Sequence, residues 1–137
     1  MKAISLQCAL SALVFLGLAG AAHAATPYST SNIYFDESGA VVGQNILLCS
    51  NLAYHAGNIH TAYSITQTIA CTSYPNGAPI TTPPPDVIVP GTQVTSYVLP
   101  SFLTITQGCA AAECVQAGSP ELPRLVDKGW TWQTGLQ

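Results

Sequence analysis

The sequence predicts a mainly β protein: a small antiparallel meander stapled by a disulfide, then a proline-rich linker and a mixed, partly irregular C-terminal extension. Three observations lead to this fold class. Residues 28–71 contain runs of Val, Ile, Tyr and Thr separated by turn residues, as short strands do. Five of the ten prolines lie between residues 73 and 85, where they exclude a helix or a ladder strand. Four cysteines follow the N-terminal apolar segment, an even number that suits disulfides.

The first 24 residues have the pattern of a secretory signal peptide. Lys2 supplies a positive charge, an apolar stretch follows, and Ala22-His23-Ala24 fits the small-x-small rule for cleavage. The apolar stretch, about 14 residues, is shorter than the roughly 20 that a spanning helix needs. We therefore expect export and a mature chain that begins near Ala25. Cys8 is removed with the signal peptide.

The remaining chain has few charges: two cations, Arg124 and Lys128, against six carboxylates. So few cations cannot neutralise a run of phosphates, so we expect no binding to nucleic acid or to anionic lipid. We also expect no stable membrane insertion once the signal peptide is cleaved. The expected location is secreted or periplasmic, and the expected partner is an unknown protein or glycan.

Residues 25–73 are predicted to form a small disulfide-stapled β domain. Its three expected strands cover residues 28–35, 40–49 and 59–71. In the first strand Ile33 and Phe35 alternate with polar neighbours, as in a half-buried strand. The turn residues 36–39 connect the first two strands as a hairpin. A polar stretch, residues 50–58, precedes the third strand, which carries mostly Ser, Thr and Ala on one face.

The rest of the chain divides by composition. Residues 74–86 are predicted to be a semi-rigid proline-rich linker with an Asn76-Gly77 turn. Residues 87–137 are predicted to be the C-terminal extension. Within it we expect short β-like runs at 87–89, 94–99 and 102–106, and two helical turns at 110–117. Trp130 and Trp132 alternate around one threonine, as a last strand or a docking tail would.

The four cysteines are predicted to form two disulfides. We favour Cys49 with Cys71 and Cys109 with Cys114, because short local closures lose the least entropy; the crossed pairings stay open. The first bond closes a loop of about 22 residues and contributes on the order of 3 kcal/mol. Residues five apart lie about 140° apart on a regular helix. A bond between Cys109 and Cys114 therefore requires Cys109 to lie before the first helical turn.

Candidate catalytic residues are sparse. His55 and His60, with Asp36 and Glu37, are the candidates for acid–base or metal chemistry, but a spacing of five is not a usual zinc-ligand spacing. We interpret them as polar loop residues. There is no Gly-x-Ser-x-Gly nucleophile elbow. Cys109 and Cys114 have four residues between them, unlike the Cys-x-x-Cys of a redox enzyme.

The sequence therefore predicts no catalytic, cofactor-binding or metal-binding residue, and a non-enzymatic exported protein that acts by surface contact or as a structural module. One alternative is a precursor or carrier whose part after Pro85 is released. A second is metal-assisted hydrolysis by His55, His60 and Asp36. The six tyrosines, a possible stacking platform for sugars or peptides, are interpreted as ordinary strand composition.

One stretch resembles a known group of proteins. Residues 24–71 contain a tyrosine-bearing strand, the segment Tyr34-Phe35-Asp36-Glu37-Ser38-Gly39-Ala40-Val41-Val42-Gly43, and two cysteines that flank a threonine-rich strand. This stretch is similar to small secreted proteobacterial domains of unknown function. The resemblance implies an exported β domain with a structural disulfide between Cys49 and Cys71, and it implies no activity.

Overall fold

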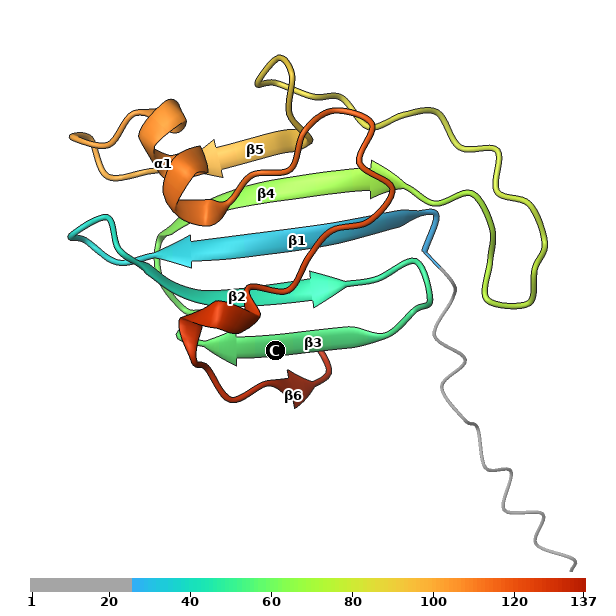
Figure 1. The fold of residues 1–137 in the computed structure, drawn as a ribbon, viewed down its shortest axis with the longest axis horizontal. Helices are drawn as coiled ribbons and strands as arrows, with labels where there is room; N and C mark the ends of the chain where they lie inside the picture. The colour runs from blue at the N-terminus through green and yellow to red at the C-terminus, as the bar shows by residue number, and fades with distance from the viewer. Residues whose placement is uncertain (1–25) are drawn as a thin grey trace, which may run out of the picture.

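A six-stranded antiparallel sheet organises the molecule, with the strand order β5-β4-β1-β2-β3-β6 (Figure 1). The computed structural model describes residues 26–137. The expected signal peptide, residues 1–24, lies outside the described residues. The elements are β1 (Tyr28–Phe35), β2 (Val41–Leu47), β3 (Ala53–Gly57), β4 (Tyr63–Ala70), β5 (Val94–Val98), α1 (Ile105–Ala112), the 3-10 helix η1 (Val126–Lys128) and β6 (Gln133–Thr134). The predicted fold class, mainly β and antiparallel, is confirmed.

β1 lies in the middle of the sheet, and alternate residues of this strand face the core. Ile33 and Phe35 are almost completely buried. Ile33 pairs with Gln44 of β2 on one side and with Ile65 of β4 on the other. Paired residues of neighbouring strands point to the same face of a sheet. The core face therefore runs across β4, β1 and β2.

The opposite face of the sheet carries a row of hydrogen-bonded polar side chains. The Asn32 amide donates to Oδ1 of Asn45 at 2.8 Å, and its own Oδ1 accepts from the Thr66 hydroxyl at 2.7 Å. Asn45 in turn donates to the Tyr34 hydroxyl at 3.1 Å. These bonds connect β4, β1 and β2 across one face. The polar face predicted for the strand in residues 59–71 is present.

The strand that the sequence analysis missed is β3. Its residues, Ala53–Gly57, fall within the stretch predicted as polar loop, and they pair with β2. The predicted third strand therefore begins later, at Tyr63, and it pairs with β1 instead of extending the meander. The order β4-β1-β2-β3 is that of a Greek key. β3 gave only a weak signal in the sequence, because its alternation of Tyr54, His55 and Ala56 covers just five residues within a polar stretch.

A short crossover, residues 58–62, carries the chain from β3 to β4. The Asn58 N–H donates to the Val42 carbonyl at 2.7 Å, so the crossover passes directly against β2. A Cβ atom on Gly43 would lie 2.3 Å from the Asn58 carbonyl oxygen, and one on Gly57 would lie 2.2 Å from the Val42 carbonyl oxygen. Both positions therefore require glycine for this connection to close.

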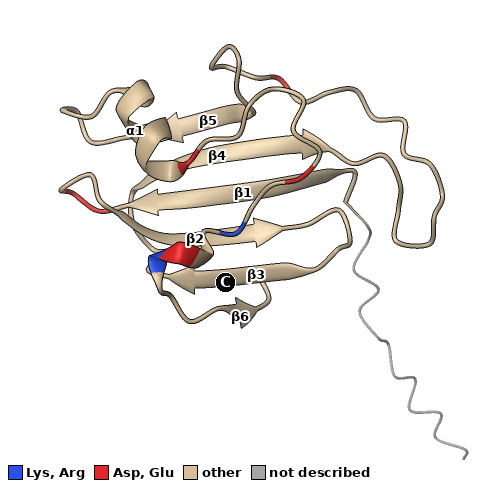
Figure 2. Ribbon diagram, viewed as in Figure 1, with Lys and Arg blue, Asp and Glu red and all other residues tan. Residues whose placement is uncertain are grey.

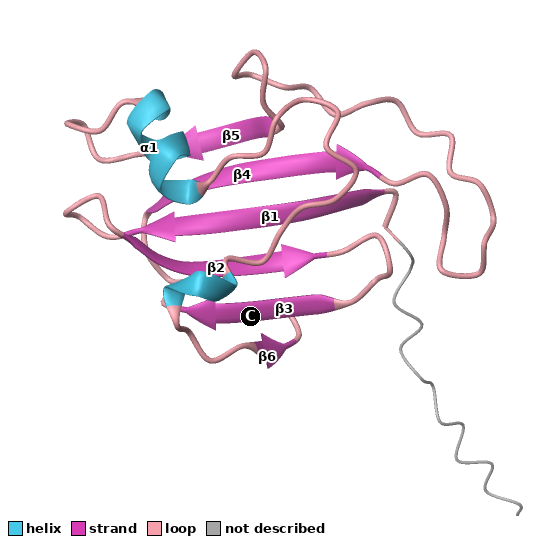
Figure 3. Ribbon diagram, viewed as in Figure 1, coloured by secondary structure: helices cyan, strands magenta, loops and turns pink. Residues whose placement is uncertain are grey.

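Helix α1 covers one end of the core face (Figure 3). Thr104 is its N-cap: the Gln107 N–H donates to the Thr104 hydroxyl oxygen, and the Thr104 N–H donates to Oε1 of Gln107 at 2.9 Å. This reciprocal pair is a capping box. The β-like run predicted at 102–106 is wrong, and the helical turns predicted at 110–117 were placed too late: only residues 110–112 belong to α1. The Thr-x-x-Gln spacing is the signal that places the helix earlier.

Both disulfides that the sequence analysis favoured are present, Cys49–Cys71 and Cys109–Cys114. The second forms in the reverse of the expected arrangement: Cys109 lies inside α1, and Cys114 lies beyond its end. Glu113, in the left-handed conformation with φ 54°, ends the helix and turns the chain. The Cys114 N–H then donates to the Cys109 carbonyl at 3.0 Å, which brings the two cysteines together.

The C-terminal part of the chain belongs to the same sheet and core as the N-terminal part. β5 pairs with β4, and β6 pairs with β3. Two core clusters combine side chains from both parts: Ile33, Phe35, Ile65, Val94, Ala112 and Leu125 in one, and Ile46, Ile69 and Leu122 in the other. Residues 26–73 and 87–137 are thus joined by backbone pairing as well as by the loop between them. Within residues 26–137, no helix has the length and hydropathy of a bilayer span.

The proline-rich segment, residues 74–86, is a loop that turns back towards the start of β1. The Gly77 N–H donates to the Tyr74 carbonyl at 2.8 Å, which closes the turn predicted at Asn76-Gly77. Further along, the Tyr28 hydroxyl donates to the Pro83 carbonyl at 2.9 Å. This contact holds the proline run beside the sheet.

Candidate functional site

The principal cavity is a groove of about 850 Å³ at the end of the sheet, beside the Cys49–Cys71 disulfide. Its volume lies in the range of small-molecule sites, roughly 300–1,000 Å³. We call it the disulfide groove. Its lining comes from four parts of the chain: Cys49, Ile69, Ala70, Cys71, Thr72, Ser73, Pro84, Pro85, Val87, Pro90, Gly91, Thr92, Gln93, Ala117, Gly118, Ser119 and Pro120.

One wall of the disulfide groove comes from the C-terminal strap, residues 115–125, which crosses the core face of the sheet (Figure 1). The Ala117 N–H donates to the Gly91 carbonyl at 3.0 Å, and the Gln93 N–H donates to the Val115 carbonyl at 3.2 Å. These bonds fix the strap to the loop before β5. The proline run also contributes to the lining through Pro84 and Pro85, and the Tyr28 hydroxyl holds this run through the Pro83 carbonyl.

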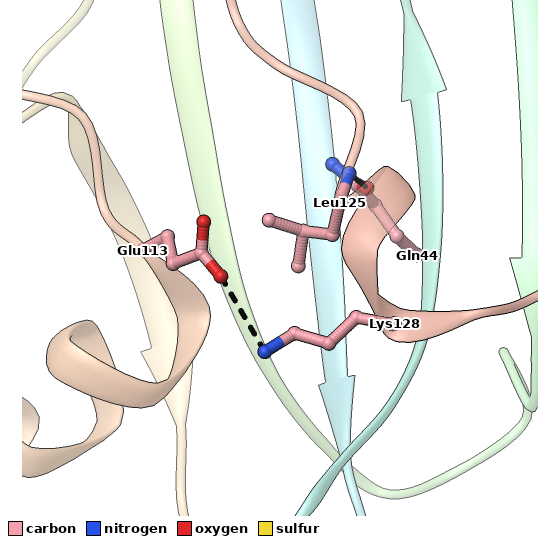
Figure 4. A network of polar contacts seen from close by, with 4 residues as sticks. All are labelled: Gln44, Glu113, Leu125 and Lys128. Atoms are coloured by element: carbon pink, nitrogen blue, oxygen red, sulfur yellow. Dashed lines mark hydrogen bonds and ion pairs between the residues drawn. The ribbon is translucent and has the colours of Figure 1, made fainter.

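Two buried glutamines hold the strap against the sheet. Oε1 of Gln67, on β4, accepts from the Val115 N–H at 2.7 Å. Oε1 of Gln44, on β2, accepts from the Leu125 N–H at 2.9 Å (Figure 4). Nε2 of Gln44 donates to the Pro123 carbonyl at 2.9 Å. Both side chains are almost fully buried. A strap with no regular secondary structure needs such partners, because its buried backbone groups have no ladder to pair with.

The chemistry of the disulfide groove is neutral. None of its lining residues is an Asp, Glu, His, Lys, Arg or Tyr, and both lining cysteines are in a disulfide. The Thr92 and Ser119 hydroxyls donate to nearby backbone carbonyls. Thr72, Ser73 and Gln93 supply further polar side chains to the lining. Proline rings, valine and isoleucine supply the apolar contact area.

A second cavity, about 230 Å³, continues the disulfide groove towards β2. It shares Cys49, Ile69 and Pro120 with the larger cavity and adds Glu121. Glu121 therefore places a carboxylate in the smaller cavity, whereas the lining of the disulfide groove itself is neutral. The Ser29 hydroxyl in the smaller cavity donates to the Leu47 carbonyl at 2.7 Å.

The structure does not bring the predicted metal candidates together. Nδ1–H of His55, which is buried in β3, donates to the Gly135 carbonyl at 2.7 Å. His60 is exposed in the crossover. Asp36 accepts from the Ser38 hydroxyl and from the Ser38 and Ala40 N–H groups in the β1–β2 turn. The described residues include no group of three His, Cys, Asp or Glu side chains placed to hold a metal.

The six tyrosines have separate roles. The Cζ atom of Arg124 lies over the Tyr54 ring, 4.5 Å from the centroid of that ring, and 5.5 Å from the Trp132 ring centroid. Tyr63 packs against the core, and Tyr97 is exposed on β5. Tyr28 and Tyr34 use their hydroxyls within the fold, and Tyr74 belongs to the turn in the proline-rich segment.

Sequence reasoning missed the groove and the two glutamines behind it. The signal available in the sequence was a glutamine on the apolar face of a strand. Gln44 lies two residues before Ile46 in β2, and Gln67 lies between Ile65 and Ile69 in β4. A buried amide needs hydrogen-bond partners, so such a position predicts a packed backbone segment opposite.

A comparison with protein-family models, curated proteins and solved structures finds no match.

Proposed function

We propose that this chain is an exported, non-enzymatic protein that binds an uncharged ligand in the disulfide groove. The observation that carries the proposal is the lining of the groove: it has the volume of a ligand site and no ionisable side chain. General acid–base and nucleophilic catalysis need such groups at the reacting atoms. Apolar contact with a few hydroxyl and amide groups is instead the usual chemistry of recognition.

The class of ligand follows from the same lining. A charged ligand would lose its hydration against prolines and a disulfide without gaining an opposite charge. An uncharged protein segment or a neutral glycan fits the mixture of apolar surface with Thr72, Ser73 and Gln93. Of the two cations, Lys128 lies 3.4 Å from the Glu113 carboxylate, and Arg124 stacks on Tyr54. Neither belongs to a basic track of the kind that binds nucleic acid.

Export rests on separate observations. The first 24 residues have the signal-peptide pattern, and two disulfides suit an oxidising compartment. Residues 24–71 resemble small secreted domains. The mature protein is therefore expected in the periplasm or outside the cell, with its disulfides formed.

The test is binding of neutral probes to oxidised mature protein. N-phenyl-1-naphthylamine serves as the apolar probe, and maltohexaose and chitohexaose serve as neutral glycans. The variant Ala117→Phe fills the groove from the strap, whereas Ala110→Phe adds the same side chain on the exposed surface of α1. We expect at least one probe to bind the wild type and Ala110→Phe equally, and Ala117→Phe at least tenfold more weakly.

Two results would contradict the proposal. One is absence of binding by all three probes up to millimolar concentration in the wild type. The other is turnover of an ester or a disulfide substrate that Ala117→Phe abolishes and Ala110→Phe does not, which would make the groove catalytic.

A further inference from the structure

The two edges of the sheet are treated differently. At one edge, β6 pairs with β3, and the Gly135 N–H donates to the Ala53 carbonyl at 2.8 Å, so the C-terminal segment covers β3. At the other edge, β5 is the last strand in the order. The Ile88 N–H donates a hydrogen bond to the carbonyl of Val94, the first residue of β5. An edge strand offers the backbone groups on its outer side for pairing.

The outer edge at β5 is also apolar and uncharged. Tyr97 is 42% exposed and Val98 is 59% exposed. Residues 87–112 include no Asp, Glu, Lys, Arg or His, and Figure 2 shows β5 without a charged residue. Edge strands of monomeric proteins are protected by charged side chains, proline, a bulge or a covering loop. In β5 the register shift and the loop at Ile88 affect the Val94 end, whereas residues 96–98 carry no charge and no proline.

We propose that β5 pairs with β5 of a second copy, antiparallel across a two-fold axis, so that the two sheets become continuous. The pairing of β5 with β4 is regular over Ser96, Tyr97 and Val98, and shifts register before them. A two-fold axis at Tyr97 places the two Tyr97 side chains opposite each other and Ser96 opposite the partner's Val98. An aromatic cross-strand pair such as the two Tyr97 rings stabilises a sheet.

Charge favours a second copy as the occupant. Two-fold pairing sets each residue beside its own counterpart or a near neighbour, so a charged edge strand would meet like charge. The described chain has six carboxylates and two cations, so a self-contact that brought carboxylates together would be repulsive. The β5 edge is a surface on which two copies meet without bringing these carboxylates together.

The decisive experiment is sedimentation velocity of oxidised mature protein between about 1 and 200 μM. We expect a wild-type dimer at the upper concentrations. Val98→Lys introduces a charge at the edge and should sediment as a monomer throughout. Val126→Lys makes the same change at a valine 65% exposed in η1, and it should dimerise as the wild type does.

Disulfide cross-linking tests the register of the proposed β5–β5 pairing. Tyr97→Cys should give a disulfide-linked dimer on mild oxidation, whereas Leu136→Cys, 51% exposed beyond β6, should not. A monomeric wild type at 200 μM overturns the proposal. So does a dimer that Val98→Lys leaves intact, or assembly into species larger than a dimer. Circular dichroism of each variant confirms that it is folded, and neither edge variant touches the disulfide groove.

Discussion

The Oε1 atom of Gln44, on β2, accepts a hydrogen bond at 2.9 Å from the backbone N–H of Leu125, 81 residues later in the chain. The same side chain donates to the Pro123 carbonyl and to the Ser31 hydroxyl oxygen. One buried amide therefore joins the sheet to the strap that walls the disulfide groove. The neighbouring Glu113–Lys128 ion pair is at the surface (Figure 4), where such pairs contribute little.

Gln44→Leu should lower the free energy of unfolding by about 3 kcal/mol, because it leaves the Leu125 N–H and the Pro123 carbonyl buried without partners. Urea denaturation measures the change. Gln116→Leu, at an exposed position, should stay within about 0.5 kcal/mol of the wild type. Equal effects of the two substitutions would show that the buried bonds of Gln44 contribute nothing specific.

The two disulfides should differ in their contribution to stability. Cys49–Cys71 closes a loop of 22 residues and Cys109–Cys114 one of 5. The chain-entropy relation gives about 3 kcal/mol for the first and about 2 kcal/mol for the second. Urea unfolding of the two paired Cys→Ser variants provides the comparison, and a larger loss from the shorter loop would contradict the prediction.

Gly43→Ala should destabilise the fold by more than about 3 kcal/mol, since the new Cβ would meet the Asn58 backbone and force the crossover away from β2. Gly118→Ala is the comparison. Gly118 has φ +81° and open space around its Cβ position, so alanine there suffers only the left-handed penalty of about 1 kcal/mol. Thermal unfolding of both variants should separate steric contact from backbone preference.

The Asp36 turn should contribute to stability in a pH-dependent way. Hydrogen bonds from the Ser38 hydroxyl and the Ala40 N–H hold the pKa of the Asp36 carboxyl below its ordinary value. A lowered pKa in the folded state means that the stabilisation is present above the ordinary aspartate pKa and is lost as the pH falls through the folded value.

The stability difference between wild type and Asp36→Asn should therefore be largest near neutral pH and should shrink as the pH falls below about 4, the ordinary aspartate pKa. Denaturation series at several pH values measure it. Glu37→Gln, next in the sequence but outside this set of hydrogen bonds, serves as the control. A constant difference across the range would show that ionisation of Asp36 has no part in the turn.

Cleavage within residues 74–86 should leave two fragments associated under native conditions. The β4–β5 and β3–β6 pairings and both core clusters join residues on either side of the cut. The disulfides each lie within one fragment. The fragments should therefore separate in urea without reductant. Separation in native buffer would instead show that the C-terminal part is an independent unit.

Local patterns in the sequence predicted the local structure. The alternation of Ile33 and Phe35, the turn before Ala40 and the spacing of the cysteines gave β1, the first hairpin and both disulfide pairs. Each depends on residues near one another in the chain, where side-chain period and turn chemistry limit the choices. The capping box of Thr104 and Gln107 is also a local pattern, and it could have predicted the start of α1.

Only the tertiary structure decided the strand order, the partners of Gln44 and Gln67, and the disulfide groove. β4 adds to β1 because a five-residue crossover can pass against Gly43, and nothing local to β4 specifies that contact. The groove exists because the ends of β2 and β4, the proline run and the strap meet at one place. Such meetings depend on burial and backbone pairing between distant segments. The residues themselves determined a sparsely charged, disulfide-linked β chain, and long-range packing determined where that chain encloses a site.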